Sequence, residues 1–221
     1  MRCFRFASIC SLVLLCACGA PYEQSLTQYT ASYGSSNPLM SYSSYFLPAQ
    51  KDVYRCHVNA DFFLKKIHLS GLLIFKHNPD KSIRVVFTNE MGYTFFDFGY
   101  YFFDSFVVHQ IIPQLDKPGL IKTLRTDLDL LLGLNMDLRE IYYKEDTIYY
   151  KTQLLNQFAY YIVDGKTKGL QRIEVAGKQL KTSIYRLPVS TGHQMPDSIS
   201  IIHRKAKFTI NAKKIRDAST R

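Results

Sequence analysis

The sequence predicts a mainly β (α+β) chain, in which a long, curled antiparallel sheet of about eleven strands carries one inserted amphipathic helix. Apolar residues alternate with polar ones along short segments between residues 67 and 108, as in strands with one buried face. Short clusters of turn-forming residues, such as His77-Asn78-Pro79-Asp80, separate these segments. Helical spacing of apolar residues is clear only after Pro118. These three observations favour hairpins around a single helix.

The first seventeen residues have the pattern of an export signal. Arg2 and Arg5 precede the apolar stretch 9–16, which is too short to span a bilayer. The segment Leu15-Cys16-Ala17-Cys18 resembles the bacterial lipobox. That resemblance implies cleavage before Cys18 and a lipid (palmitate-type) anchor on it, which would be effectively permanent. An ordinary signal peptide with incidental cysteines is the alternative.

Cleavage at this position would leave Cys18 and Cys56 as the cysteines of the mature chain, so no internal disulfide is expected. Cys56 is expected to be a small buried apolar residue. Loss of Arg2 and Arg5 lowers the formal net charge from +10 to +8. Residues 18–221 are numerous enough to fold around a core without covalent links.

Residues 18–50 are rich in Ser, Tyr and Gln and contain three prolines, which favours a flexible tether. A tether of this length reaches roughly 30 Å. The alternative for part of it is a short helix at residues 38–46 that lies on the domain. Acidic residues do not follow Cys18 directly, so we expect the periplasmic face of the outer membrane as the location.

The folded domain is expected at residues 51–213, followed by a basic tail at 214–221. Eleven or twelve segments have strand patterns. They are residues 54–61, 67–76, 82–89, 93–99, 102–108, 138–144, 147–152, 157–163, 169–176, 180–187, 198–203 and 205–212. Their short connections predict antiparallel pairing. No internal repeat divides the chain, which predicts a single domain.

The helix is expected to start at Asp116-Lys117-Pro118 and to end at Gly133, a length of about fifteen residues. Leucines recur along it at helical spacing. A sheet of this many strands must curl, split or close. One apolar helix could then fill the concave side of the curled sheet.

The order of these segments resembles the LolA/LolB-like lipoprotein-carrier family. The resemblance rests on Leu69-Ser70-Gly71-Leu72-Leu73, on residues 82–87 and on residues 92–97, a strand that opens with Gly92. It implies a half-barrel whose concave, apolar cavity binds acyl chains or lipoproteins. The receptor of this family also projects a leucine from the loop that corresponds to residues 89–92. Here the only apolar residue of that loop is Met91, our candidate for membrane transfer.

The candidate cavity residues are apolar positions on the aromatic strands and on the helix. They are Phe87, Phe95, Phe96, Phe98, Phe102, Phe106, Leu124 and Leu128. The alternative for each is an ordinary place in the core. Adjacent tyrosine pairs at 142–143, 149–150 and 160–161 are expected to place one ring inward and one outward, with wet hydroxyl groups.

The sequence gives no support for catalysis, a metal site or a cofactor. It contains no Gly-x-Ser-x-Gly, His-Glu-x-x-His or phosphate-loop motif. Cys56 and His57 are neighbours in a strand and therefore point to opposite faces. Asp97 is expected on the outer face or paired with Arg84. We expect a protein that is not an enzyme.

Basic residues concentrate near the C-terminus, at Arg204, Lys205, Lys207, Lys213, Lys214, Arg216 and Arg221. An anionic lipid or an acidic protein is a candidate partner for them, and a solvated edge strand is the alternative. Nucleic acid is not expected as a partner of an exported protein. The function we expect is binding of acyl chains or lipoproteins by a membrane-anchored lipoprotein. The alternative is a non-catalytic structural lipoprotein that docks a partner in an envelope complex.

Overall fold

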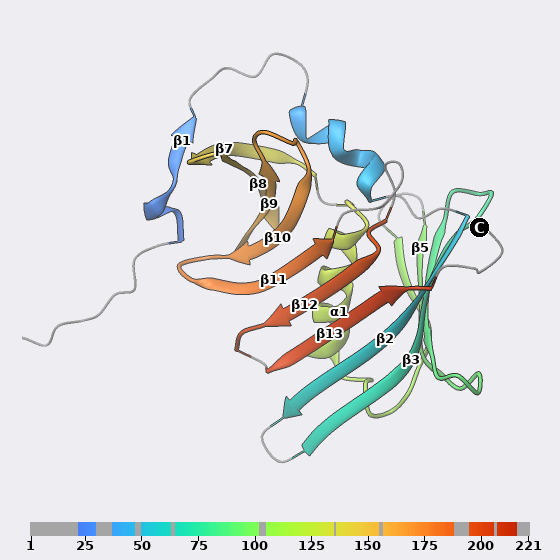
Figure 1. The fold of residues 1–221 in the computed structure, drawn as a ribbon. Helices are drawn as coiled ribbons and strands as arrows, with labels where there is room; N and C mark the ends of the chain where they lie inside the picture. The colour runs from blue at the N-terminus through green and yellow to red at the C-terminus, as the bar shows by residue number, and fades with distance from the viewer. Residues whose placement is uncertain are drawn as a thin grey trace, which may run out of the picture.

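The computed structural model describes residues 22–29, 37–46, 50–62, 65–101, 105–134, 136–154, 157–187, 195–205 and 207–215. In these ranges, thirteen strands form one antiparallel sheet in the order β1-β7-β8-β9-β10-β11-β12-β13-β2-β3-β4-β5-β6. The two edge strands in this order are β1 and β6. The sheet curves around the helix α1 (Figure 1). The predicted fold class, a curled antiparallel sheet with an inserted helix, is confirmed.

Each of the twelve predicted segments contains a strand within the described residues, and the count of about eleven was low. The strands are β1 (Thr27–Tyr29), β2 (Lys51–Phe62), β3 (Lys65–His77), β4 (Ile83–Thr88), β5 (Thr94–Tyr101), β6 (Ser105–Ile111), β7 (Leu138–Lys144), β8 (Thr147–Leu154), β9 (Gln157–Asp164), β10 (Leu170–Ala176), β11 (Leu180–Leu187), β12 (Ser198–His203) and β13 (Phe208–Lys214). The strand β1 was not predicted, because its three residues are all exposed and show no alternation.

The helix α1 (Pro118–Leu131) forms where the leucine spacing predicted it. Proline occupies its first turn, and Gly133 ends it with φ +65°, a left-handed conformation that glycine adopts at low cost. The N-cap is Lys117, whose side chain makes no capping hydrogen bond, so Asp116 is not the cap. No helix in the described ranges is long and apolar enough to cross a membrane.

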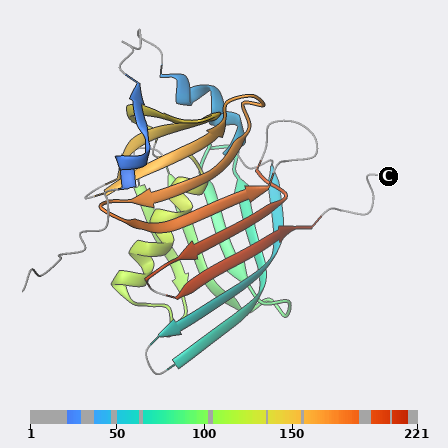
Figure 2. The same cartoon turned by 60° about the vertical axis from the view of Figure 1, so that its left-hand side comes forward.

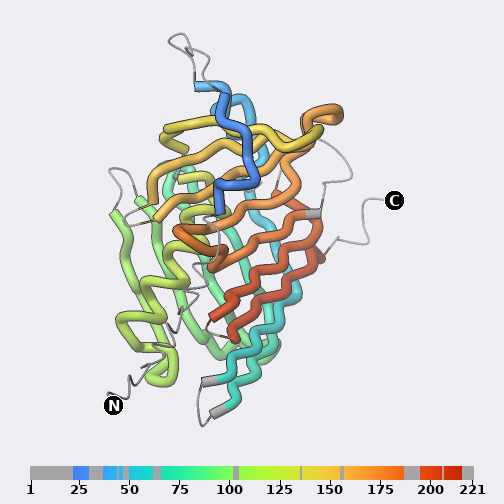
Figure 3. The backbone as a smooth tube through the Cα atoms, turned by 90° about the vertical axis from the view of Figure 1, so that its left-hand side faces the viewer, coloured from blue at the N-terminus to red at the C-terminus, as the bar shows by residue number. Residues whose placement is uncertain are grey.

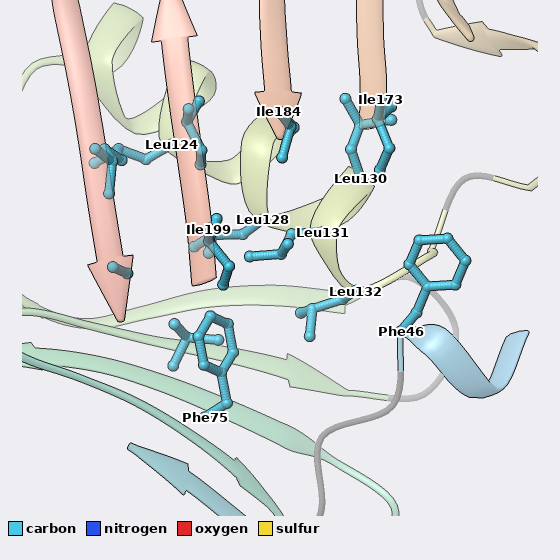
Figure 4. Close-up of a cluster of buried hydrophobic side chains, with 14 of the residues drawn as sticks. Phe46, Phe75, Leu124, Leu128, Leu130, Leu131, Leu132, Ile173, Ile184 and Ile199 are labelled. Carbon is cyan, nitrogen blue, oxygen red and sulfur yellow. The ribbon is translucent and has the colours of Figure 1, made fainter. Parts of the chain in front are cut away.

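The position of α1 follows from the strand order. It connects β6, at one edge of the sheet, to β7, which lies next to the other edge. The helix therefore crosses the concave side of the sheet, as the turned view shows (Figure 2). Leu124, Leu128 and Leu131 point from α1 toward the strands and form the centre of the core (Figure 4).

Two stretches before β2 lie on the domain. The 3₁₀ helix η1 (Tyr22–Ser25) lies on the outer side of β8 to β10, and β1 follows it and pairs with β7 at the edge of the sheet (Figure 3). The second 3₁₀ helix, η2 (Pro38–Tyr45), buries Leu39 and Tyr42, and Phe46 follows it into the core. The helix considered for residues 38–46 is therefore present. Both stretches belong to the segment 18–50, for which a flexible tether was the first expectation.

Candidate functional site

An apolar cavity of about 30 Å³ lies between α1 and the concave face of the sheet. Its walls come from α1, from β2 to β5, from β12 and β13, and from the turn before α1. The lining residues are Cys56, Val58, Leu69, Leu73, Phe87, Phe96, Leu115, Leu120, Leu124, Asp127, Leu128, Leu131, Ile199, Ile201, Phe208 and Ile210. Asp127 is the one charged residue among them.

Strand periodicity explains why these side chains face the cavity. Alternate residues of a strand share a face, so Cys56 and Val58 of β2 both point inward. Across the next pair of strands, Phe87 of β4 lies directly opposite Phe96 of β5, with ring centroids 5.7 Å apart. Burial raises the pKa of the Cys56 thiol to about 12, which fits the predicted small apolar role of this residue.

Four of the eight candidate residues line the cavity: Phe87, Phe96, Leu124 and Leu128. Phe98 is fully buried and stacks on Phe96 at 4.5 Å, and Phe106 packs against Phe98 at 5.1 Å. These two rings support the wall without lining it.

Two candidates, Phe95 and Met91, lie elsewhere, and two more fall outside the described residues. Phe95 lines a separate, open pocket of about 360 Å³ with Ile67 and Tyr93, so it is not part of this cavity. Met91 is 89 % exposed at the tip of the β4–β5 turn. Phe102 lies outside the described residues, as does Cys18.

The volume of the cavity limits what it holds in this conformation. Pockets for small molecules measure about 300 to 1,000 Å³, roughly ten times this volume or more. An acyl chain therefore fits only if α1 moves away from the sheet. In this conformation, the interface between α1 and the sheet has room for about one water-sized group.

A second pocket of about 240 Å³ lies beside the first, between α1 and strands β9 to β12. At its base, Asp127 Oδ2 lies 2.7 Å from His203 Nε2, and His203 Nδ1 lies 3.1 Å from Thr182 Oγ1. Asp127 is 2 % exposed. Burial raises the pKa of its carboxyl group, and the contact with His203 opposes that rise. Sequence reasoning missed this cluster, although an acid on the apolar side of α1 was a signal for it.

The interior of strands β7 to β11 carries a buried cation. The guanidinium of Arg186 is buried, lies 4.7 Å from the ring centroid of Phe46 and donates from Nη2 to the Tyr45 carbonyl. Its Nε and Nη1 have no hydrogen-bond partner among the described residues. Burial lowers the pKa of Arg186 to about 10, and the nearby Tyr54 and Tyr161 raise it only in part.

The outer face of the same strands is covered, which corrects the expectation of wet tyrosine hydroxyls. Tyr142, Tyr149 and Tyr160 point outward but are buried, with Tyr22 and Leu26 packed against them. The stretch 22–29 therefore acts as a cover on this face.

Lys151, 6 % exposed, lies on the outer face between two carboxylates. Its Nζ is 2.8 Å from Glu23 and 3.3 Å from Glu140. The Tyr160 hydroxyl donates to Glu23, and the Tyr22 hydroxyl donates to Glu174. These contacts attach the N-terminal stretch to the sheet.

The predicted pairing of Asp97 with Arg84 is confirmed, whereas the edge strand considered for the C-terminal basic residues is wrong, because β13 lies between β12 and β2 within the sheet. Arg84 donates to Asp97 through two hydrogen bonds of 2.6 and 2.7 Å, as expected. Lys213 and Lys214 line an open groove of about 460 Å³, and Lys214 also lies 2.6 Å from Asp52. Arg216 and Arg221 lie outside the described residues.

The chain resembles known proteins in structure and not in sequence. No protein-family model and no curated protein sequence matches the chain. A LolA superfamily protein from Nitrosomonas europaea is similar in structure with a TM-score of 0.50 and 9 % identity, over 84 % of this chain and 95 % of that one. A putative outer membrane lipoprotein-sorting protein domain from Vibrio parahaemolyticus matches with a TM-score of 0.43 and 4 % identity, over 80 % and 88 %. The chain thus shares its curled-sheet fold with a LolA superfamily protein, which agrees with the fold that the sequence analysis expected.

Proposed function

We propose that this protein is a lipid-anchored envelope lipoprotein that binds acyl chains, or the acyl groups of lipoproteins, between α1 and the concave face of its sheet. The observation that carries the proposal is the apolar cavity beneath α1, where Asp127 is the only charged residue among the described residues of the lining. The half-barrel fold, which the chain shares with a LolA superfamily protein, supports it.

Binding requires α1 to leave the sheet, because the closed cavity measures about 30 Å³. This movement breaks no strand pairing, since α1 contributes only side chains to the core. The methylene groups of the ligand then pack against Leu124 and Leu128 in place of the strands. Each buried methylene of a ligand contributes about 0.8 kcal/mol. A long acyl chain can therefore offset the cost of opening.

A matched pair of leucines on α1 tests cavity binding. Leu128 lines the cavity, whereas Leu130 is buried in the same helix without lining it. Both Leu128→Ala and Leu130→Ala should destabilise the protein by about 2–5 kcal/mol. Binding of N-phenyl-1-naphthylamine, an uncharged fluorescent probe, should change about threefold or more only in Leu128→Ala. Equal effects of the two variants, or no binding of the probe by any form, would refute the site.

The anchor has its own test. Metabolic labelling with palmitate should label the wild-type protein and Cys16→Ala but not Cys18→Ala. Label that persists in Cys18→Ala would refute the anchor. Fractionation of the labelled cells then tests the proposed outer-membrane location.

The alternative function, a structural lipoprotein that docks a partner, is favoured by the nearly filled interior. The edge strand β6 also exposes Val107 and Val108. Mass spectrometry of protein purified natively from membranes separates the two functions. Bound lipid supports the carrier, and a lipid-free protein that also fails to bind the naphthylamine probe supports docking.

A further inference from the structure

The apolar cavity and the polar pocket meet at one residue. Asp127 of α1 lines both of them. On one side of its carboxylate lie apolar residues such as Leu124, Leu128 and Phe208, and on the other side lies a polar pocket of about 240 Å³. A molecule that occupied both spaces would need an apolar tail and a polar head.

The polar pocket is positively charged. Lys122 of α1, Lys181 of β11 and Lys205 of the β12–β13 turn all line it, and all three are exposed. None of these lysines forms an ion pair with a carboxylate among the described residues, and the Lys181 Nζ donates 2.9 Å to the Gln157 amide oxygen. The remaining polar lining residues are Asp127 and His203, together with Thr123, Thr126, Gln157 and Thr182.

Asp127 does not neutralise these lysines. Its Oδ2 is 2.7 Å from His203 Nε2, which makes His203 the partner of this buried carboxylate. The lysines therefore present their charge to whatever enters the pocket. Such a cluster favours an anionic group, and it disfavours a cationic one by like-charge repulsion.

The contact between Asp127 and His203 also separates the two spaces. It joins α1 to β12, and the hydrogen bond between His203 and Thr182 extends the link to β11. When α1 moves from the sheet, this link must break, and the polar pocket then opens into the apolar cavity. The head of a ligand could stay at the lysines while its tail lies under α1.

We propose that the ligand is an anionic amphiphile, whose carboxylate or phosphate head binds Lys122, Lys181 and Lys205 and whose acyl tail passes Asp127 into the cavity beneath α1. This inference rests on the proposed acyl-binding function and narrows its substrate class. Both head groups accept hydrogen bonds from ammonium groups, so the lysines recognise their shared charge.

The test measures how four amphiphiles with the same fourteen-carbon tail displace N-phenyl-1-naphthylamine from the purified protein, below their micelle concentrations. Myristate and 1-myristoyl lysophosphatidate carry the anionic heads, tetradecanol is neutral and tetradecylamine is cationic. We expect half-displacement by the anions at concentrations at least about tenfold lower than for the alcohol. The amine should be the weakest. Comparison of the two anions shows whether the source is a fatty acid or a phospholipid.

Two triple variants test whether the pocket lysines cause the preference for anions. The variant Lys122→Gln/Lys181→Gln/Lys205→Gln should lose the preference for anions and keep its affinity for the uncharged probe. The control, Lys51→Gln/Lys76→Gln/Lys144→Gln, removes the same charge from exposed lysines that do not line the pocket, and it should keep the preference.

Each outcome is decisive. Probe binding with no preference among the four heads, or a preference that survives the pocket substitutions, overturns the inference and leaves the acyl-binding function intact. Failure of the probe and of all four amphiphiles to bind overturns both. Loss of the preference in the control as well would assign it to net charge and would also overturn the proposed pocket.

Discussion

The strands β2 to β6 and the strands β7 to β11 belong to one sheet, but their interiors differ. We call the first group the phenylalanine arm and the second the tyrosine arm. The phenylalanine arm places Phe75, Phe87 and Phe98 on the concave side. The tyrosine arm places Tyr161 there, together with the buried cation Arg186. The apolar cavity is lined by the phenylalanine arm, by β12 and β13 and by α1, and by no residue of β7 to β11.

The outer faces differ as well. The tyrosine arm is covered by residues 22–29 and by the ion pairs of Lys151 with Glu23 and Glu140. The outer face of the phenylalanine arm carries polar residues such as the Arg84–Asp97 pair. Paired polar groups, such as those on the outer face of the tyrosine arm, fix a sheet more firmly than apolar contacts that can be exchanged for a ligand. We therefore expect the tyrosine arm to be the support, and the phenylalanine arm to carry the acyl binding that we propose. Substitutions in the two arms should separate these roles.

Gly71→Ala should damage the phenylalanine arm most. A Cβ at this position would lie 2.0 Å from the Thr88 carbonyl oxygen, so β3 and β4 would have to separate. We expect a loss of about 3 kcal/mol in the free energy of unfolding, measured by urea denaturation. The control is Gly119→Ala, where a Cβ meets no atom within 4 Å. A similar loss in both variants would contradict the steric explanation.

Lys151→Met tests the cover on the tyrosine arm. It leaves Glu23 and Glu140 without their cation, and because both carboxylates are about one-third exposed, water compensates in part. We expect a loss of about 2 kcal/mol and faster amide hydrogen exchange at Thr27–Tyr29. Lys144→Met, at an exposed position of β7, should cost less than about 0.5 kcal/mol. Unchanged exchange in Lys151→Met would show that the ion pairs do not hold the cover.

Acid should loosen the same cover by a smaller amount. Burial alone would raise the pKa of Glu23, but Lys151 and the Tyr160 hydroxyl lower it below its ordinary value of 4.5. A lowered pKa means that Glu23 contributes stability above about pH 4.5, and that this contribution is lost as the pH falls through the folded-state value. Hydrogen exchange at Thr27–Tyr29, corrected for its intrinsic pH dependence, should show this loss. A pH-independent opening would rule out Glu23 as the cause.

The reactivity of the Cys56 thiol reports how often the cavity in the phenylalanine arm opens, and its measurement needs no substitution. Its thiol pKa of about 12, against an ordinary value of 9.0, reduces the thiolate fraction about a thousandfold at pH 8. Iodoacetamide should therefore leave Cys56 unmodified in the native protein and modify it in urea, as peptide mapping would show. A ligand that opens the cavity should raise the native rate. Rapid modification of the ligand-free protein would mean that α1 already opens often.

The periodicity of the sequence was sufficient to predict most of the fold and four of the sixteen residues that line the candidate cavity. Alternation places Phe87 and Phe96 on the concave face, and helical spacing places Leu124 and Leu128 opposite them. Phe95 departs from the pattern because the register between β4 and β5 shifts after Phe87, where a bulge leaves Phe95 without a partner. The pairing of Asp127 with His203, 76 residues away, depends on how α1 lies on the sheet. Local patterns do not contain that information, and they do not contain the cavity volume.

The docked N-terminal stretch has a consequence for the geometry of anchoring. The Tyr22 amide donates to the Lys178 carbonyl at 3.1 Å, so the chain is fixed to the domain four residues after Cys18. Four residues of extended chain span at most about 14 Å. If Cys18 carries the lipid that we propose, a short connection takes the place of the long flexible tether expected from the sequence. The outer side of β7 to β10 then lies near the lipid headgroups. An acyl ligand of the kind that we propose would then have to reach a domain held close to the membrane.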